Sequence, residues 1–170
     1  PESTRLGFLR QESALPPDRR ASEVFATHIA ALVSAGELPE SEAVGLSQLG
    51  LLKPRETGKR IGELSMGQQR RLDLALILAV RPQVLLLDEP TAGMSRSESD
   101  AAVELIRRMT AGKTLLMVEH DMGVIFGLAD RIAVVVYGEV IACNTPQNIR
   151  SNPAVQEAYL GTNAQEGGAA

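Results

Sequence analysis

The stretch Val84-Leu85-Leu86-Leu87-Asp88-Glu89-Pro90 decides the fold class of this 170-residue chain. A continuous apolar run that ends in two acids predicts a strand buried on both faces of a parallel sheet. In such folds, ligands bind beyond the carboxyl ends of the strands. Asp88 is therefore placed to hold Mg²⁺, usually through water, and Glu89 to accept a proton from, or orient, an attacking water. Because many strands end in Asp-Glu, this stretch needs support from its surroundings.

Leu64-Ser65-Met66-Gly67-Gln68 lies upstream of this strand, just before a helix expected from Gln69 to Val80. Unpaired backbone N–H groups and the helix dipole make a helix N-terminus an anion site. Ser65 adds a hydroxyl donor, and Gly67 allows the backbone to come close to a phosphate. The alternative is that Ser65 is only a helix cap.

Val118-Glu119-His120-Asp121 lies downstream, at the end of the next expected strand. A histidine at that position can reach a γ-phosphate and the water that attacks it. The alternative is a polar residue that merely leaves a strand end. Each of the three blocks, taken alone, is therefore a weak signal.

Strands and helices alternate along the chain, which predicts an α/β fold with a mostly parallel sheet. Strands are expected at residues 5–9, 84–88, 114–119, 132–136 and 140–143, the last two as a hairpin. Helices are expected at residues 21–35, 40–49, 69–80 and 96–109. The mainly helical stretch before residue 63 is expected to form a small separate subdomain.

Composition narrows the classes of partner. The 17 basic and 21 acidic residues give a net charge of −4, so we expect no nucleic-acid or anionic-lipid footprint. The longest apolar runs are too short to span a bilayer. Cys143 is the only cysteine, which excludes an internal disulfide and favours a reducing compartment. Its apolar neighbours predict a buried thiol.

The order and spacing of the three blocks resemble those of the ABC-type ATPases, the nucleotide-binding subunits of ABC transporters. The resemblance covers nearly the whole chain. It implies that Leu64–Gln68 is the signature motif, usually written LSGGQ, with Met66 in place of the first glycine. It also implies that Asp88 is the Walker B acid, Glu89 the catalytic glutamate and His120 the switch histidine.

Two further segments take roles from this resemblance. Gln11, after the first strand, would be the glutamine that touches Mg²⁺ and the transmembrane partner. Ala92-Gly93-Met94-Ser95 falls at the D-loop, with Ser95 where the family often has Asp. The implied fold is a partial P-loop NTPase fold. Its parts would be a strand and Q-loop segment (1–20), a helical subdomain (21–62), a RecA-like core (63–160) and a flexible tail (161–170).

The phosphate-binding loop of this family is not found in the sequence. The motif G-x-x-x-x-G-K-[ST] fails at Gly112-Lys113-Thr114, because position 107 is Arg107, and at Gly58-Lys59, because Arg60 follows. The resemblance places this loop upstream of Gln11, before the chain begins. We therefore expect a truncated subunit that binds no ATP tightly and is inactive alone, but can complete a composite site with an intact subunit.

Residues 145–161 and the block Glu119-His120-Asp121-Met122 look like those of branched-chain amino acid importer ATPases. The first hypothesis is thus an importer subunit that uses ATP and Mg²⁺. It would dimerise with a second ABC ATPase subunit and dock on permease subunits at the inner face of the membrane. A second is an interaction module without catalysis. A third hypothesis is a soluble ATPase that acts on nucleic acid or ribosomes. The sequence argues against it, because it shows no basic excess, no zinc-ligand cysteine set and no coiled-coil heptad.

Overall fold

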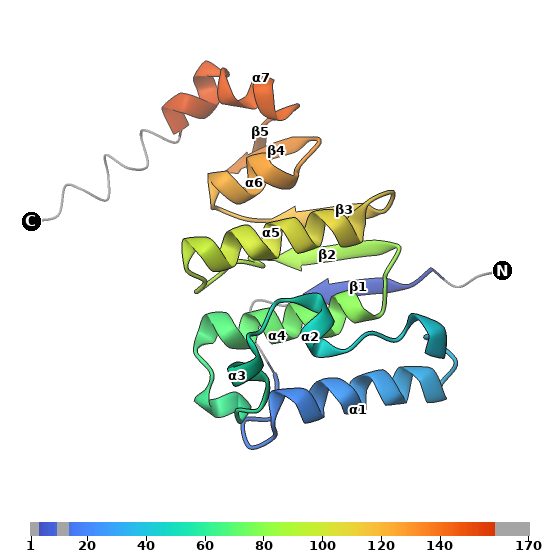
Figure 1. Cartoon of the computed structure of the whole chain (residues 1–170). Helices are drawn as coiled ribbons and strands as arrows, with labels where there is room; N and C mark the ends of the chain where they lie inside the picture. Colours follow the sequence, from blue (N-terminus) through green and yellow to red (C-terminus); the bar gives the residue numbers. More distant parts are fainter. Residues whose placement is uncertain (1–3, 10–13, 159–170) are drawn as a thin grey trace, which may run out of the picture. The chain divides into compact units, whose positions relative to one another are not determined.

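The computed structural model describes residues 4–9 and 14–158 of the chain (Figure 1). The chain divides into two compact units, Pro1–Val124 and Ile125–Ala170. In chain order the elements are β1 (Leu6–Leu9), α1 (Ala21–Ser34), η1 (Glu40–Glu42), α2 (Leu46–Leu49), α3 (Pro54–Thr57), η2 (Ile61–Glu63), α4 (Met66–Ala79), β2 (Val84–Asp88), α5 (Arg96–Thr110), β3 (Thr114–Val118), α6 (Met122–Leu128), β4 (Ile132–Val136), β5 (Glu139–Asn144) and α7 (Pro146–Arg150).

The first unit contains a three-stranded parallel sheet in the order β1-β2-β3 (Figure 1). Phe8 of β1 pairs with Leu86 of β2, which in turn pairs with Leu116 of β3. Helix α4 packs against β1 so closely that a methyl group on Gly7 would collide with the side chain of Ile77. This parallel sheet flanked by helices confirms the predicted α/β class.

One face of this sheet is open at its outer strands, β1 and β3, while the central strand β2, expected to be buried on both faces, is buried at Leu85 and Leu87 and half-buried at Val84 and Leu86. Side chains alternate between faces along a strand, so the members of each cross-strand pair point the same way. The buried face contains Leu85 and Leu87. On the other face four apolar side chains are exposed: Leu6 (61%), Phe8 (51%), Leu116 (63%) and Val118 (64%). Among the described residues, that face is therefore uncovered at β1 and β3.

Residues 21–63 are mainly helical, as expected, with one correction. The helix predicted from residue 40 to residue 49 is two short pieces, η1 and α2. The backbone between them is extended at Ala43 (ψ 129°) and Gly45 (ψ 152°), so helical hydrogen bonding cannot continue. Apolar side chains, including Phe25 and Leu52, are buried in this part of the unit. The segment boundaries proposed from the sequence remain predictions.

The second unit contains the β4–β5 hairpin, which confirms the prediction at residues 132–143. Tyr137 and Gly138 both have positive φ in its two-residue turn, as a tight right-twisting hairpin requires. Thr145 caps α7 by accepting a hydrogen bond from the N–H of Asn148. Cys143 lies on β5 and is exposed, so the expectation of a buried thiol was wrong.

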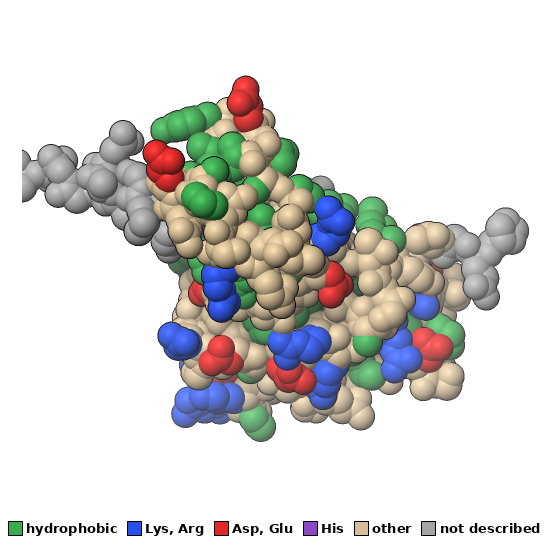
Figure 2. Space-filling model, turned by 90° about the horizontal axis from the view of Figure 1, so that it is seen from above, with side chains coloured by type: hydrophobic (Ala, Val, Ile, Leu, Met, Phe, Trp, Pro, Cys, Tyr) green, Lys and Arg blue, Asp and Glu red, His purple; other side chains and the backbone are tan. Residues whose placement is uncertain are grey.

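Neither a membrane-spanning helix among the described residues nor, on the face drawn in Figure 2, a concentration of one charge is found. Among the residues that the structure describes, no helix has the length and apolar composition needed to cross a bilayer. On the face drawn in Figure 2, acidic and basic side chains are interspersed. That pattern is typical of an ordinary solvated surface.

Candidate functional site

The site begins where β2 ends, at Asp88 and Glu89. Glu89 has a φ of 45°, an unusual conformation for a residue with a side chain. Two contacts hold Glu89 in this conformation. The N–H of Glu89 donates to the carbonyl of Val118 at 2.9 Å, and the guanidinium of Arg70 donates to the carbonyl of Glu89. Arg70 also donates to the carbonyl of Asp88. Backbone strain of this kind clusters at functional sites.

Arg70 lies on α4 and is buried, so its charge is removed from water. This desolvation lowers the pKa of Arg70, and the negative charges of Asp73, Asp88, Glu89 and Glu119 oppose that shift. The guanidinium therefore serves two purposes: it fixes the backbone of the two acids and places a positive charge beside them. Sequence reasoning missed Arg70, although a charged pair at residues 70–71 in an apolar helical pattern is a usable signal.

His120 and Glu89, each expected just after the end of a strand, are brought together at the carboxyl edge of the sheet. The Nδ1 atom of His120 lies 3.6 Å from Oε1 of Glu89. The histidine side chain is 77% exposed and that of the glutamate 30%. Both groups can thus reach a ligand bound beyond the strand ends, which is the geometry needed to orient an attacking water.

Glu119 is a buried carboxylate that the sequence did not single out. Its side chain is 1% exposed. One oxygen accepts hydrogen bonds from the N–H and the hydroxyl of Thr91. The other accepts from the N–H of His120 at 2.9 Å and of Asp121 at 3.3 Å. Glu119 thereby ties the segment after Glu89 to the segment that carries His120.

The signature segment differs from its predicted form, because α4 begins at Met66 instead of near Gln69. Ser65 is the N-cap: its hydroxyl accepts from the N–H of Gln68 at 3.2 Å, and the Gln68 side chain accepts from the N–H of Ser65 at 3.0 Å. This is a capping box. Met66 is exposed at the start of the helix. A capped helix end can still bind an anion, because the cap satisfies only part of the N–H groups of the first turn.

Residues 92–95, the predicted D-loop, lie directly against Gly67 of the predicted signature motif. A methyl group on Gly67 would collide with the carbonyl of Gly93, which itself has a φ of 71°. The glycine at position 67 is therefore required by a contact within the chain, which the sequence reading did not foresee. Ser95 caps α5, and its N–H donates to Glu98 at 2.9 Å.

The donor set suits a magnesium ion held together with phosphate. Across residues 4–9 and 14–158, no three His, Cys, Asp or Glu side chains gather into a metal site. Mg²⁺ is usually held by one or two carboxylates and completes its octahedron with water and phosphate oxygens. Asp88 fits that mode as a single protein ligand. Gln11, the other predicted metal contact, lies outside the described residues.

Known proteins are similar to this chain in both sequence and fold. Residues 1–92 match the family model described as ABC transporter, and residues 139–165 the one described as branched-chain amino acid ATP-binding cassette transporter. The high-affinity branched-chain amino acid transport ATP-binding protein LivG of Escherichia coli is 39% identical over 127 residues, 74% of this chain and 49% of LivG. The corresponding BraF of Pseudomonas aeruginosa is 43% identical over 102 residues, 59% of this chain and 40% of BraF.

A solved ABC cassette structure has a similar fold. The dimeric post-hydrolysis state of the ATP-binding cassette MJ0796, bound to ADP and Pi, superposes with a TM-score of 0.68 at 26% identity. The superposition covers 84% of this chain and 63% of the MJ0796 chain. The chain spans about half the length of the curated relatives it matches. These likenesses confirm the resemblance inferred from the sequence, and the chain belongs to the family of ABC transporter ATP-binding domains.

Proposed function

We propose that the chain supplies the signature motif and the hydrolytic edge of an ABC ATPase that drives import of branched-chain amino acids. The observation that carries this proposal is the convergence of Glu89 and His120 beside Asp88 at the carboxyl edge of the sheet. Its partners would be a second ABC ATPase subunit, identical or different, and permease subunits at the cytoplasmic face of the membrane. The likeness to LivG and BraF supports the substrate class.

Each residue has a distinct task in this proposal. Asp88 would hold Mg²⁺, which when bound would neutralise phosphate charge on ATP. Glu89 orients the attacking water and accepts its proton, and His120 contacts the γ-phosphate from the next strand. Ser65 and the first turn of α4 bind the phosphates of ATP held by the P-loop of the other subunit. The sequence printed here contains no G-x-x-x-x-G-K-[ST].

Association with an intact subunit tests this function. The purified chain is immobilised and offered a LivG-type subunit that carries its own P-loop, with and without Mg-ATP. We expect association that requires Mg-ATP, that Ser65→Arg abolishes and that Glu89→Gln preserves or prolongs. Ser41→Arg, an exposed serine on η1, is the matched control for adding a charge. Association without any nucleotide dependence would contradict the proposal.

The same experiment separates an interaction module from a catalytic partner. If the chain completes the site of the intact subunit through Ser65, ATP turnover in the mixture exceeds that of the intact subunit alone, and Ser65→Arg removes the excess. If the chain only docks, turnover in the mixture equals that of the intact subunit alone. Urea unfolding of each variant shows whether loss of the Ser65 cap, worth about 1 kcal/mol, has changed the fraction folded.

A further inference from the structure

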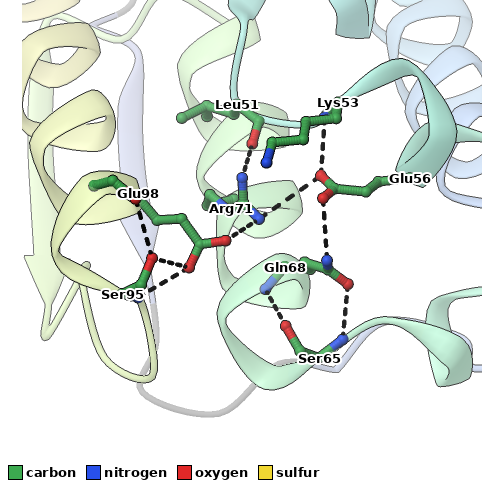
Figure 3. A network of polar contacts seen from close by, with 9 residues as sticks. Leu51, Lys53, Glu56, Ser65, Gln68, Arg71, Ser95 and Glu98 are labelled. Carbon is green, nitrogen blue, oxygen red and sulfur yellow. Dashed lines mark hydrogen bonds and ion pairs between the residues drawn. The ribbon is translucent and has the colours of Figure 1, made fainter.

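The N-caps of α4 and α5 are joined by an unbroken run of polar side chains (Figure 3). On the α4 side, Gln68 accepts from the N–H of Ser65 and donates through Nε2 to Oε1 of Glu56 at 3.1 Å. The other oxygen of Glu56 accepts from the N–H of Lys53 at 2.8 Å. The signature cap is thus connected to a carboxylate of α3.

Arg71 carries the run across to α5. Its Nη2 atom lies 2.6 Å from Oε1 of Glu98 and 3.7 Å from Oε2 of Glu56, and its Nη1 donates to the carbonyl of Leu51 at 2.7 Å. The second oxygen of Glu98 accepts both the N–H and the hydroxyl of Ser95 at 2.9 Å. In Figure 3, Arg71 lies between the two carboxylates, with Ser65 and Ser95 at the two ends.

One buried cation is therefore shared by two carboxylates. The side chains of Arg71 and Glu56 are 6% and 4% exposed, and that of Glu98 is 28% exposed. Removing one partner from a buried ion pair leaves an uncompensated charge, so neither acid tolerates loss of the guanidinium. The guanidinium holds its donors in a rigid planar fork, which the rotating ammonium of lysine does not: Nη1 donates to the Leu51 carbonyl while Nη2 donates to Glu98 and lies near Glu56.

We propose that Arg71 is a positioning residue that fixes the signature serine, Ser65, and the D-loop serine, Ser95, relative to one another. The close approach of Gly67 to Gly93 sets the distance between the two segments, and the Arg71 network sets their orientation. The roles of both serines toward nucleotide rest on the proposed function. The coupling between them does not, because it can be measured without nucleotide.

Amide hydrogen exchange of the 170-residue chain reads both ends of the network. The N–H groups of Ser65 and Ser95 each donate to a side chain, Gln68 and Glu98, so their exchange reports local opening of the two caps. Arg71→Lys keeps the charge but not the fork. We expect exchange at both serines to accelerate together by about fivefold, as loss of a typical hydrogen bond predicts.

Two controls separate positioning from general stability. Leu78→Ala removes a buried side chain of α4 outside the network and lowers global stability. Arg108→Lys makes the same chemical change at an exposed position. We expect neither to reproduce a joint acceleration at Ser65 and Ser95, once exchange rates are compared at equal global stability. Acceleration confined to Ser95 in Arg71→Lys would overturn the proposal.

A further pair of variants tests the route. On a Gln68→Ala background the run is cut between Ser65 and Glu56, so Arg71→Lys should accelerate exchange at Ser95 alone. If Arg71→Lys does not fold, Glu56→Gln serves instead: it leaves the cation to Glu98, so exchange at Ser95 should slow although Glu56 does not touch that residue. An unchanged rate at Ser95 in that variant would overturn the proposal.

Discussion

At the scale of single residues, Gly67 shows how closely two functional segments approach. Gly67→Ala forces its methyl group into the carbonyl of Gly93, and neither backbone can yield cheaply. We expect a destabilisation of about 1–3 kcal/mol, the usual cost of overpacking. Urea unfolding followed by circular dichroism measures it. Gly58→Ala is the matched control, because its φ is −83° and a methyl group there meets open space. Equal stability of Gly67→Ala and Gly58→Ala would show that a methyl group at position 67 does not collide with Gly93.

Glu98 makes the network sensitive to acid. The hydrogen bond from the Ser95 N–H, opposed by burial and supported by the Ser95 hydroxyl and the charge of Arg71, holds the pKa of Glu98 below its ordinary value of 4.5. A carboxyl whose pKa is lowered by folding contributes stability that is complete above pH 4.5 and is lost as the pH falls through the lower, folded value. The stability of the chain should therefore fall in that window.

Glu98→Gln tests this pH dependence. We expect the variant to be less stable than the parent by about 1–3 kcal/mol near neutral pH, because two hydrogen bonds to a charged oxygen are weakened. Below pH 4.5 the difference should shrink, because the parent loses the same charge by protonation. Unfolding curves at several pH values measure the gap. Glu104→Gln, which removes an exposed partner of Arg107, should leave the pH dependence unchanged.

At the scale of elements, Glu119 joins the turn after β2 to the turn after β3. Glu119→Gln leaves one carbonyl oxygen for four donors, so at least two N–H or O–H groups lose their acceptor. We expect a loss of about 1–3 kcal/mol and faster amide exchange at both Thr91 and His120. Exposed Glu139 of the hairpin provides the control, Glu139→Gln.

Thr91→Val completes a double-mutant cycle with Glu119→Gln. Both changes act on the same hydrogen bond, so their effects on the free energy of unfolding should overlap. We expect the double variant to be more stable than the sum of the single losses by at least about 0.5 kcal/mol. Strict additivity would show that the two turns are held independently.

Prediction from sequence succeeded where the signal is local. Short apolar runs predicted the strands β1 to β5. The residues that follow two of these runs predicted that Asp88, Glu89 and His120 stand at strand ends. The helix expected from residue 40 failed because two extended residues break it. Arg70 and Glu119 were missed because the contacts that define their roles, with Asp88 and Thr91, span 18 and 28 positions, and a local pattern can mark such a residue but not its distant partner.

At the scale of the whole molecule, the open sheet face sets how the chain behaves in solution. Leu6, Phe8, Leu116 and Val118 share that face and are more than half exposed. Exposed apolar patches of this kind promote association. We expect the 170-residue chain to bind hydrophobic dyes and to self-associate as its concentration rises.

Leu116→Thr with Val118→Thr should reduce both dye binding and the association seen by sedimentation. Threonine keeps the β propensity of these positions while removing apolar surface, and neither side chain is packed, so stability should change by less than about 1 kcal/mol. Leu85→Thr, on the buried face of the same sheet, should instead cost several kcal/mol, because it leaves a cavity and buries a hydroxyl. Unchanged dye binding by the double variant would show that the apolar surface that binds the dye lies elsewhere. The exposed Val135 and Val140 of the hairpin would then be the next residues to substitute.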